Sequence, residues 1–158
     1  MKISQRGAIP PFIVMDVMKA AADREASGEG VLHMEVGQPS TPAPSGVINA
    51  AKQALDGDLL GYTLATGILT LRERIARHYL EYYGVTVPAE RICVTTGSSA
   101  AFLLTFLAAF DPGDKVAILR PGYPCYRNIL GALDIEAVEV PVGPDSRFQP
   151  TLESLDAA

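Results

Sequence analysis

The sequence predicts an α/β fold built on a mostly parallel sheet, because the second half of the chain alternates between two kinds of segment. Short runs rich in valine and isoleucine occur at Arg91–Thr95, Lys115–Leu119 and Glu136–Val140. Between them lie two segments of helical length, Ser98–Phe110 and Tyr123–Leu133. Strands that alternate with helices of this length are typical of βαβ units joined by right-handed crossovers.

The first half of the chain predicts helices joined by loops. Pro10 and Pro11 precede an amphipathic stretch that glycines close, which indicates a helix with proline near its first turn. Leu32–Val36 is predicted to be extended and to lead into a loop rich in proline, serine and threonine. Further helices are predicted over Gly46–Leu55 and Leu69–Tyr83.

Two helix starts carry their own signals. Thr70 and Glu73 have the spacing of a capping box at the start of the third helix. The last residues, Thr151–Ala158, are expected to begin another helix, and a domain is not expected to end there.

Composition and charge exclude several classes of protein. The 158 residues are 48% hydrophobic and 20% charged, which is typical of a globular chain. The net charge is −5, and no cluster of lysine and arginine is present, so nucleic acid is not expected to be the main partner. Cys93 and Cys125 have neither a disulfide framework nor metal-ligand spacing, so we expect reduced thiols, no metal site and a cytoplasmic location.

One uncharged stretch, Ile92–Phe110, has nearly the length of a membrane span. The polar turn within it leaves only Ala100–Phe110 continuously apolar, about half of what a bilayer needs. We therefore expect a buried helix and no membrane partner. The N-terminus is not expected to be a signal peptide, because two prolines and Asp16 interrupt its apolar run.

The turn Thr95–Ser99 is the strongest candidate for a binding site. It opens a helix, so backbone N–H groups and the positive end of the helix dipole are available for a phosphate. Gly97 allows close approach of the backbone, and Ser98 and Ser99 add hydroxyl donors. An ordinary polar cap before a buried helix is the alternative.

Tyr123 follows the next predicted strand, so it is expected at the same edge of the sheet as the phosphate turn. Its alternative role is packing on the following helix. A phosphate anchor beside a flat aromatic side chain suits a phosphorylated, planar, ring-shaped cofactor.

Five motifs occur in the order MEVGQPS, LGYTLATGILTLRERIARHY, VTTGSSAAF, DPGDKVAILRPGYPCY and FQPTLESL. In this order they resemble the class I/II pyridoxal-phosphate-dependent aminotransferases of fold type I. The resemblance implies the N-terminal half of a three-layer αβα large domain, preceded by an N-terminal helical segment. It further implies that residues 1–45 form an N-terminal arm and helix contributing to the small domain and interface. Residues 46–158 would be the first half of the cofactor-binding large domain, truncated at its C-terminus.

The resemblance also implies roles for single residues. Gly97, Ser98 and Ser99 match the turn that holds the phosphate of pyridoxal 5′-phosphate, and Tyr123 matches the aromatic residue that stacks on its ring. Tyr62 matches a tyrosine that reaches the cofactor phosphate of the partner subunit, so a homodimer is expected. The same loop could instead use Tyr62 for packing alone. Gly37 matches a glycine beside the substrate carboxylate, although it could simply serve a turn.

The implied reaction moves an amino group between an amino acid and a 2-oxo acid, as in amino-acid metabolism. The cofactor serves as the electron sink, so the protein chiefly orients it. The Schiff-base lysine of the family is expected beyond Ala158, so this chain carries no catalytic residue of its own. The alternatives are a truncated inactive homologue, a pyridoxal-phosphate-dependent lyase or decarboxylase, and a non-catalytic regulator. His33 and His78 have no evident partner and are interpreted as solvated or packed side chains.

Overall fold

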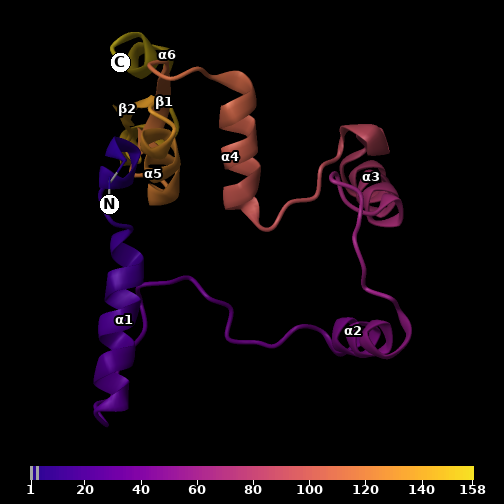
Figure 1. The fold of residues 1–158 in the computed structure, drawn as a ribbon. Coiled ribbons are helices and arrows are strands. Elements are labelled where there is room, and N and C mark those ends of the chain that lie inside the picture. Colours follow the sequence, from indigo (N-terminus) through magenta and orange to yellow (C-terminus); the bar gives the residue numbers. More distant parts are fainter. Residues whose placement is uncertain (1, 3) are drawn as a thin grey trace. The chain divides into compact units, whose positions relative to one another are not determined.

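The computed structural model describes residue 2 and residues 4–158, and these divide into two compact units. The first unit combines Met1–Val36 with Thr96–Ala158, and the second is Gly37–Thr95. Figure 1 shows the elements in chain order. Each unit is described below by itself.

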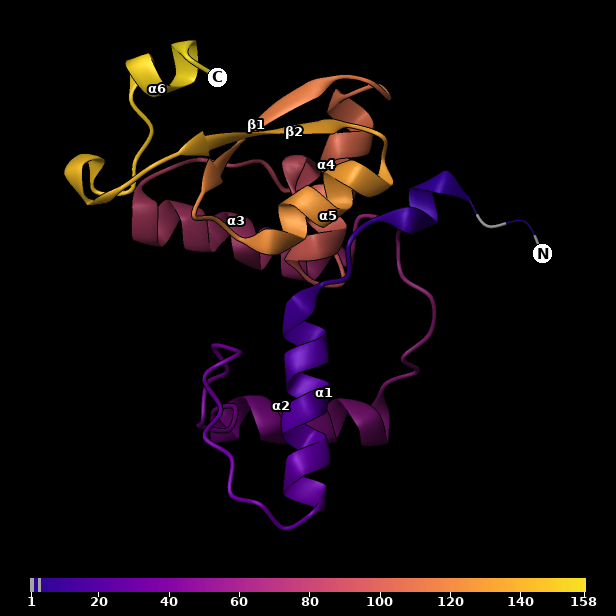
Figure 2. The same cartoon turned by 90° about the vertical axis from the view of Figure 1, so that its left-hand side faces the viewer.

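The first unit contains a parallel pair of strands with a helix between them in sequence. Strand β1 (Lys115–Arg120) pairs with β2 (Glu136–Pro141), from Lys115 opposite Glu136 to Arg120 opposite Pro141. Helix α5 (Pro124–Ala132) connects them and packs on β2, as Figure 2 shows. The predicted βαβ unit is therefore present.

The core of this unit lies where α5 meets the strands. Leu130 and Val140 are fully buried, and Ile135 is 4% exposed. Leu130 lies on α5 and Val140 on β2, so the apolar face of the helix covers the strand pair. This packing holds α5, whose N-cap is Tyr123, on the strand pair.

Three further α-helices lie in the described part of the first unit. Helix α1 (Ile13–Ala26) follows the two prolines, as predicted, and a short 3₁₀ helix, η1 (Gln5–Ala8), precedes it. Helix α4 (Ser98–Ala109) packs on α5. A short C-terminal helix, α6 (Leu152–Asp156), has a capping box between Thr151 and Ser154.

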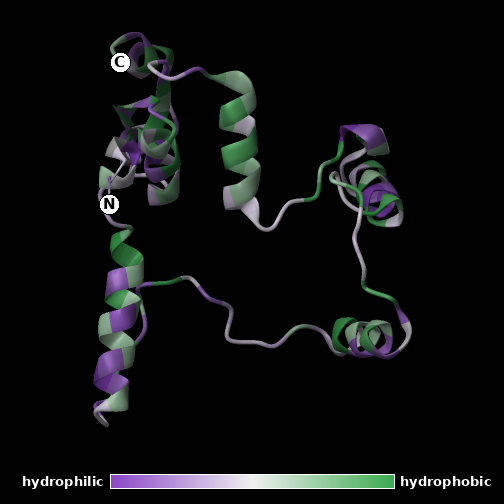
Figure 3. Ribbon diagram, in the orientation of Figure 1, coloured by the Kyte–Doolittle hydropathy of each residue, from purple (hydrophilic) through white to green (hydrophobic). Residues whose placement is uncertain are grey.

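Helix α4 is less buried than the sequence predicts. It is apolar on nearly all sides (Figure 3), a pattern typical of a fully buried helix. However, none of its residues is buried, and Leu103, Leu104 and Leu107 are 40%, 53% and 59% exposed. Within the first unit α5 packs against α4 and covers only part of its surface.

The second unit is helical. Helix α2 (Ser45–Gly57) leads through a loop to α3 (Leu69–Tyr83), whose bounds match the prediction, and then to the 3₁₀ helix η2 (Ala89–Arg91). Arg72 of α3 is only 8% exposed, and its Nη1 donates a hydrogen bond of 3.2 Å to the carbonyl oxygen of Ala89.

Two predictions in this unit are wrong. Arg91–Thr95 does not form a strand, because the backbone N–H of Val94 bonds a loop carbonyl, that of Thr66, instead of a neighbouring strand. The capping box proposed for Thr70 and Glu73 is also absent: α3 begins at Leu69, so Thr70 lies inside its first turn, and Ile68 occupies the N-cap.

Candidate functional site

The predicted phosphate turn lies at the start of α4. Gly97 is the N-cap of this helix, with φ +83° and ψ 168°, a combination that is essentially restricted to glycine. A side chain at Gly97 would meet no atom within 4 Å, so the backbone here is open on that side. Because the N-cap is a glycine, this residue has no side chain that could cap the helix.

Ser98 and Ser99 form the first turn of α4. Both residues are exposed. With Gly97 they place two hydroxyl groups beside the positive end of a 12-residue helix. This arrangement fits a phosphate group, which accepts hydrogen bonds from backbone amides and hydroxyls together.

Tyr123 is the N-cap of α5, three residues after β1 ends at Arg120. Its side chain is 49% exposed, so part of the phenol ring is open to a ligand. Gly122 allows the turn before it, because a Cβ at this position would clash with the carbonyl oxygen of Leu119. The sharp turn thus places Tyr123 near the carboxyl end of β1.

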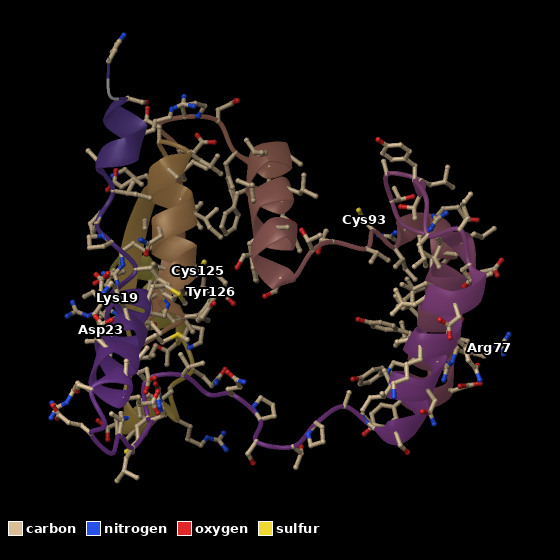
Figure 4. The ribbon with its side chains drawn as sticks, turned by 60° about the horizontal axis from the view of Figure 1, so that its bottom comes forward. Lys19, Asp23, Arg77, Cys93, Cys125 and Tyr126 are labelled. Carbon is tan, nitrogen blue, oxygen red and sulfur yellow. The ribbon has the colours of Figure 1, made fainter. Side chains whose placement is uncertain are left out.

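The starts of α4 and α5 touch. The hydroxyl oxygen of Ser99 lies 3.6 Å from the Cys125 sulfur, within hydrogen-bonding range for a thiol. Behind this contact the rings of Phe102 and Tyr126 pack with their centroids 4.5 Å apart. Figure 4 shows Cys125 and Tyr126 on α5. The structure therefore brings the predicted phosphate turn and Tyr123 to the same end of the α4–α5 pair.

A charge cluster holds α5 on the strands. Glu139 of β2 accepts a hydrogen bond of 3.0 Å from Arg120 Nη1 and one of 2.7 Å from Arg127 Nη1. Arg120 ends β1 and Arg127 lies on α5, so one carboxylate joins three elements. The cluster supports the apolar packing that sets the direction of α5.

The other two predicted site residues belong to the second unit. Tyr62 lies in the loop between α2 and α3 and is fully exposed. Gly37 is exposed, and a Cβ there would meet nothing within 4 Å, so its backbone is accessible on that side.

His33 has two partners that the sequence analysis did not find. Its Nδ1 lies 2.7 Å from a Glu35 carboxylate oxygen, and its Nε2 lies 2.9 Å from one of Glu25 on α1. The hydrogen bond to Glu25, followed by that to Glu35, raises the pKa of His33 from 6.5 to about 9. The imidazolium in turn lowers the pKa of Glu35. In an extended segment alternate side chains lie on one side, so the spacing of residues 33 and 35 could have indicated the contact between His33 and Glu35.

We expect His33 to keep its proton until well above neutral pH. The pKa of His33 in the folded chain lies above its value in the unfolded chain. The two hydrogen bonds to glutamate therefore stabilise the folded state fully below pH 6.5, and this stabilisation is lost as pH rises through about 9. A proton NMR titration of the imidazole should show a midpoint near 9, falling toward 6.5 when Glu25 and Glu35 are both replaced by glutamine. A wild-type midpoint near 6.5 would contradict the described contacts.

Two features are absent from the part of the chain that the structure describes. No cluster of three or more histidine, cysteine, aspartate or glutamate side chains there could hold a metal ion. No helix among these residues has the length and apolar character needed to cross a bilayer. Cys93 and Cys125 are both free thiols, and Figure 4 shows Cys93 in the segment between α3 and α4.

The sequence profile described as Aminotransferase class I and II matches residues 29–158. The chain belongs to this family. A valine–pyruvate aminotransferase of Mycobacterium tuberculosis is 51% identical over 154 residues, covering 98% of this chain and 40% of the relative. The chain thus spans about 40% of the length of this aminotransferase.

Solved aminotransferases have the same fold over the whole chain. The crystal structure of an aminotransferase from Mycobacterium tuberculosis matches with a TM-score of 0.94 and 49% identity, covering 100% of this chain and 41% of that one. An aspartate aminotransferase from Thermus thermophilus, solved with maleate, matches with a TM-score of 0.93 and 30% identity. The match covers 100% of this chain and 42% of the Thermus chain.

These matches confirm two predictions from the sequence. The structures are fold type I aminotransferases, so the α/β fold class of a partial, N-terminal portion is confirmed. Class I and II aminotransferases depend on pyridoxal 5′-phosphate, so the family-level prediction of the cofactor is confirmed as well. The start of α4 and the half-exposed Tyr123 fit such a cofactor, which has a dianionic phosphate and a planar ring.

Proposed function

We propose that this chain supplies the phosphate seat and the ring platform of a pyridoxal-phosphate-dependent aminotransferase. The contact between Ser99 and Cys125 carries the proposal, because it joins the anion-binding end of α4 to the helix that Tyr123 caps. Gly97, Ser98 and Ser99 bind the phosphate, chiefly through backbone N–H groups. Tyr123 offers its ring face to the pyridine ring, and together these residues fix position and orientation.

The reaction we propose moves an amino group between an amino acid and a 2-oxo acid. When bound, pyridoxal 5′-phosphate supplies the aldehyde that takes up the amino group and a ring that withdraws electrons. The residues of this chain bind and orient it. The identity of 51% with a valine–pyruvate aminotransferase supports valine and pyruvate as the first substrate pair to test.

Two residues of the second unit take supporting roles in this proposal. Gly37 lies beside the substrate carboxylate, and its exposed backbone supports this role. Tyr62 reaches the cofactor phosphate of a partner subunit in a homodimer, and its full exposure in a loop leaves it available for such a contact. We further propose that residues 1–45 are the N-terminal arm and helix, that residues 46–158 start the large domain, and that the protein is cytoplasmic.

An assay of amino transfer tests the function. The protein that carries this chain is incubated with pyridoxal 5′-phosphate, pyruvate and a panel of L-amino acids beginning with valine, and alanine is measured. We expect alanine to form with stoichiometric loss of the donor, and none to form without cofactor. Release of carbon dioxide or ammonia in place of alanine would indicate a decarboxylase or lyase, and no turnover would indicate an inactive homologue.

A further inference from the structure

Tyr123 is held by aromatic rings from two directions. The ring of Phe12 lies 6.4 Å from the Tyr123 ring between centroids, at an interplanar angle of 77°. The ring of Tyr126 lies 5.3 Å away at 76°. Both contacts are edge-to-face, the geometry that aromatic pairs favour. Tyr126 also packs on Phe102 of α4, so one of the two supports is itself anchored.

The other support, Phe12, comes from the segment of residues 9–14 that precedes and opens α1, here named the proline segment. Its described polar contact with α5 is a hydrogen bond of 2.8 Å from Asn128 Nδ2 to the carbonyl oxygen of Pro10. Pro10 and Pro11 stiffen the backbone around that carbonyl. The bond is thus well placed to fix the proline segment on α5.

Apolar packing also holds this segment, because Ile9 Cγ2 lies against Gly131 of α5, where an added Cβ would be 3.5 Å from it. A cavity of about 520 Å³ remains between the proline segment and α5, with Phe12, Pro124 and Asn128 in its wall. A second cavity, of about 360 Å³, has Asn128 and Ser99 in its wall. Asn128 therefore borders both spaces, and its amide supplies the described hydrogen bond between the segment and the helix that Tyr123 caps.

We propose that Asn128 and Phe12 are positioning residues for Tyr123. The Asn128 amide latches the proline segment onto α5, and the latched segment holds Phe12 against the Tyr123 ring. This inference rests on the proposed function, in which Tyr123 is the ring platform for the cofactor. Without the latch the platform loses one of its two supports and is less preorganised, so the cofactor binds more weakly.

Two substitutions test the latch in the protein that carries this chain. Asn128→Asp keeps the size of the side chain but cannot donate to Pro10, and Phe12→Leu keeps the latch but removes the ring. Phe148→Leu, at a ring that is 50% exposed elsewhere in the first unit, is the matched control. The double variant of residues 12 and 128 tests whether the two act together.

Two readouts need no cofactor. We expect chymotrypsin to cleave after Phe12 several-fold faster in Asn128→Asp than in the wild type, because the segment is released. We also expect both single variants to weaken the tyrosine signal in near-ultraviolet circular dichroism, and the double variant to weaken it no further. The proposed latch would be overturned if chymotrypsin cleaved Asn128→Asp no faster than the wild type. It would also be overturned if the double variant lost as much tyrosine signal as the two single variants together.

Equilibrium binding of pyridoxal 5′-phosphate tests the effect on the platform. We expect both single variants to bind about 3- to 10-fold more weakly than the wild type, and Phe148→Leu to bind unchanged. A released segment with unchanged affinity would overturn the positioning role. A wild type that binds no cofactor would refute the proposed function instead, and the two cofactor-free readouts would still decide whether the latch exists.

Discussion

Replacing Gly97 by alanine should lower the affinity for pyridoxal 5′-phosphate by about 100-fold. Gly97 has φ +83° and ψ 168°, and a residue with a Cβ pays about 1–3 kcal/mol to remain in such a conformation. Relief of that strain would rotate the peptide groups at the start of α4. Loss of one or two hydrogen bonds to a charged phosphate costs about 2–4 kcal/mol, and each 1.4 kcal/mol is about tenfold in affinity.

Gly113 provides the control for this substitution. It also has a positive φ, +92°, and open space around it, and it lies in the turn before β1. Gly113→Ala should therefore cost stability of a similar order and leave cofactor affinity unchanged. Isothermal titration with pyridoxal 5′-phosphate, together with urea unfolding of both variants, separates the two effects. Equal losses of affinity in the two variants would show that strain alone, and not the phosphate seat, is responsible.

Replacing Leu130 by alanine should destabilise the first unit by about 2–5 kcal/mol. Leu130 is fully buried where α5 meets the strands, and truncation leaves a cavity that the surrounding side chains fill only in part. The loss matters for the proposed function because Tyr123, the proposed ring platform, is the N-cap of α5, and Asn128 and Arg127 lie on the same helix.

Urea unfolding measures this effect, with Leu152→Ala as the matched control. Leu152 is 80% exposed on α6, so its truncation should change the free energy of unfolding by less than about 0.5 kcal/mol. A loss of less than about 1 kcal/mol for Leu130→Ala would mean that the core described for the first unit is not the one that holds α5.

Elements with a local signal could be predicted from the sequence. Leu69–Tyr83 has helical periodicity over its whole length and forms α3 with those bounds. Glu136–Val140 lies within the observed β2, Glu136–Pro141. The strand predicted over Arg91–Thr95 is absent from the structure. Strand propensity shows only that the side chains would fit a sheet, whereas a strand also needs a partner strand at hydrogen-bonding distance. In the structure Val94 bonds the loop at Thr66 instead.

The same distinction separates the parts of the candidate site. Gly97, Ser98 and Ser99 are adjacent in sequence, so their motif could be recognised and placed at a helix start. Asn128 and Pro10 are 118 residues apart, and no spacing rule connects them. The partnership of His33 with Glu25 likewise depends on the turn after α1, which no pattern of charges specifies.

The measurement that tests the central claim most directly compares two ligands that differ only in the phosphate group. Binding of pyridoxal 5′-phosphate and of pyridoxal is measured by equilibrium dialysis with the protein that carries this chain, as wild type and as Gly97→Ala. We expect the wild type to favour the phosphorylated ligand by about 100-fold and the variant to lose most of that preference. Equal affinities of the wild type for the two ligands would contradict a phosphate seat at the start of α4.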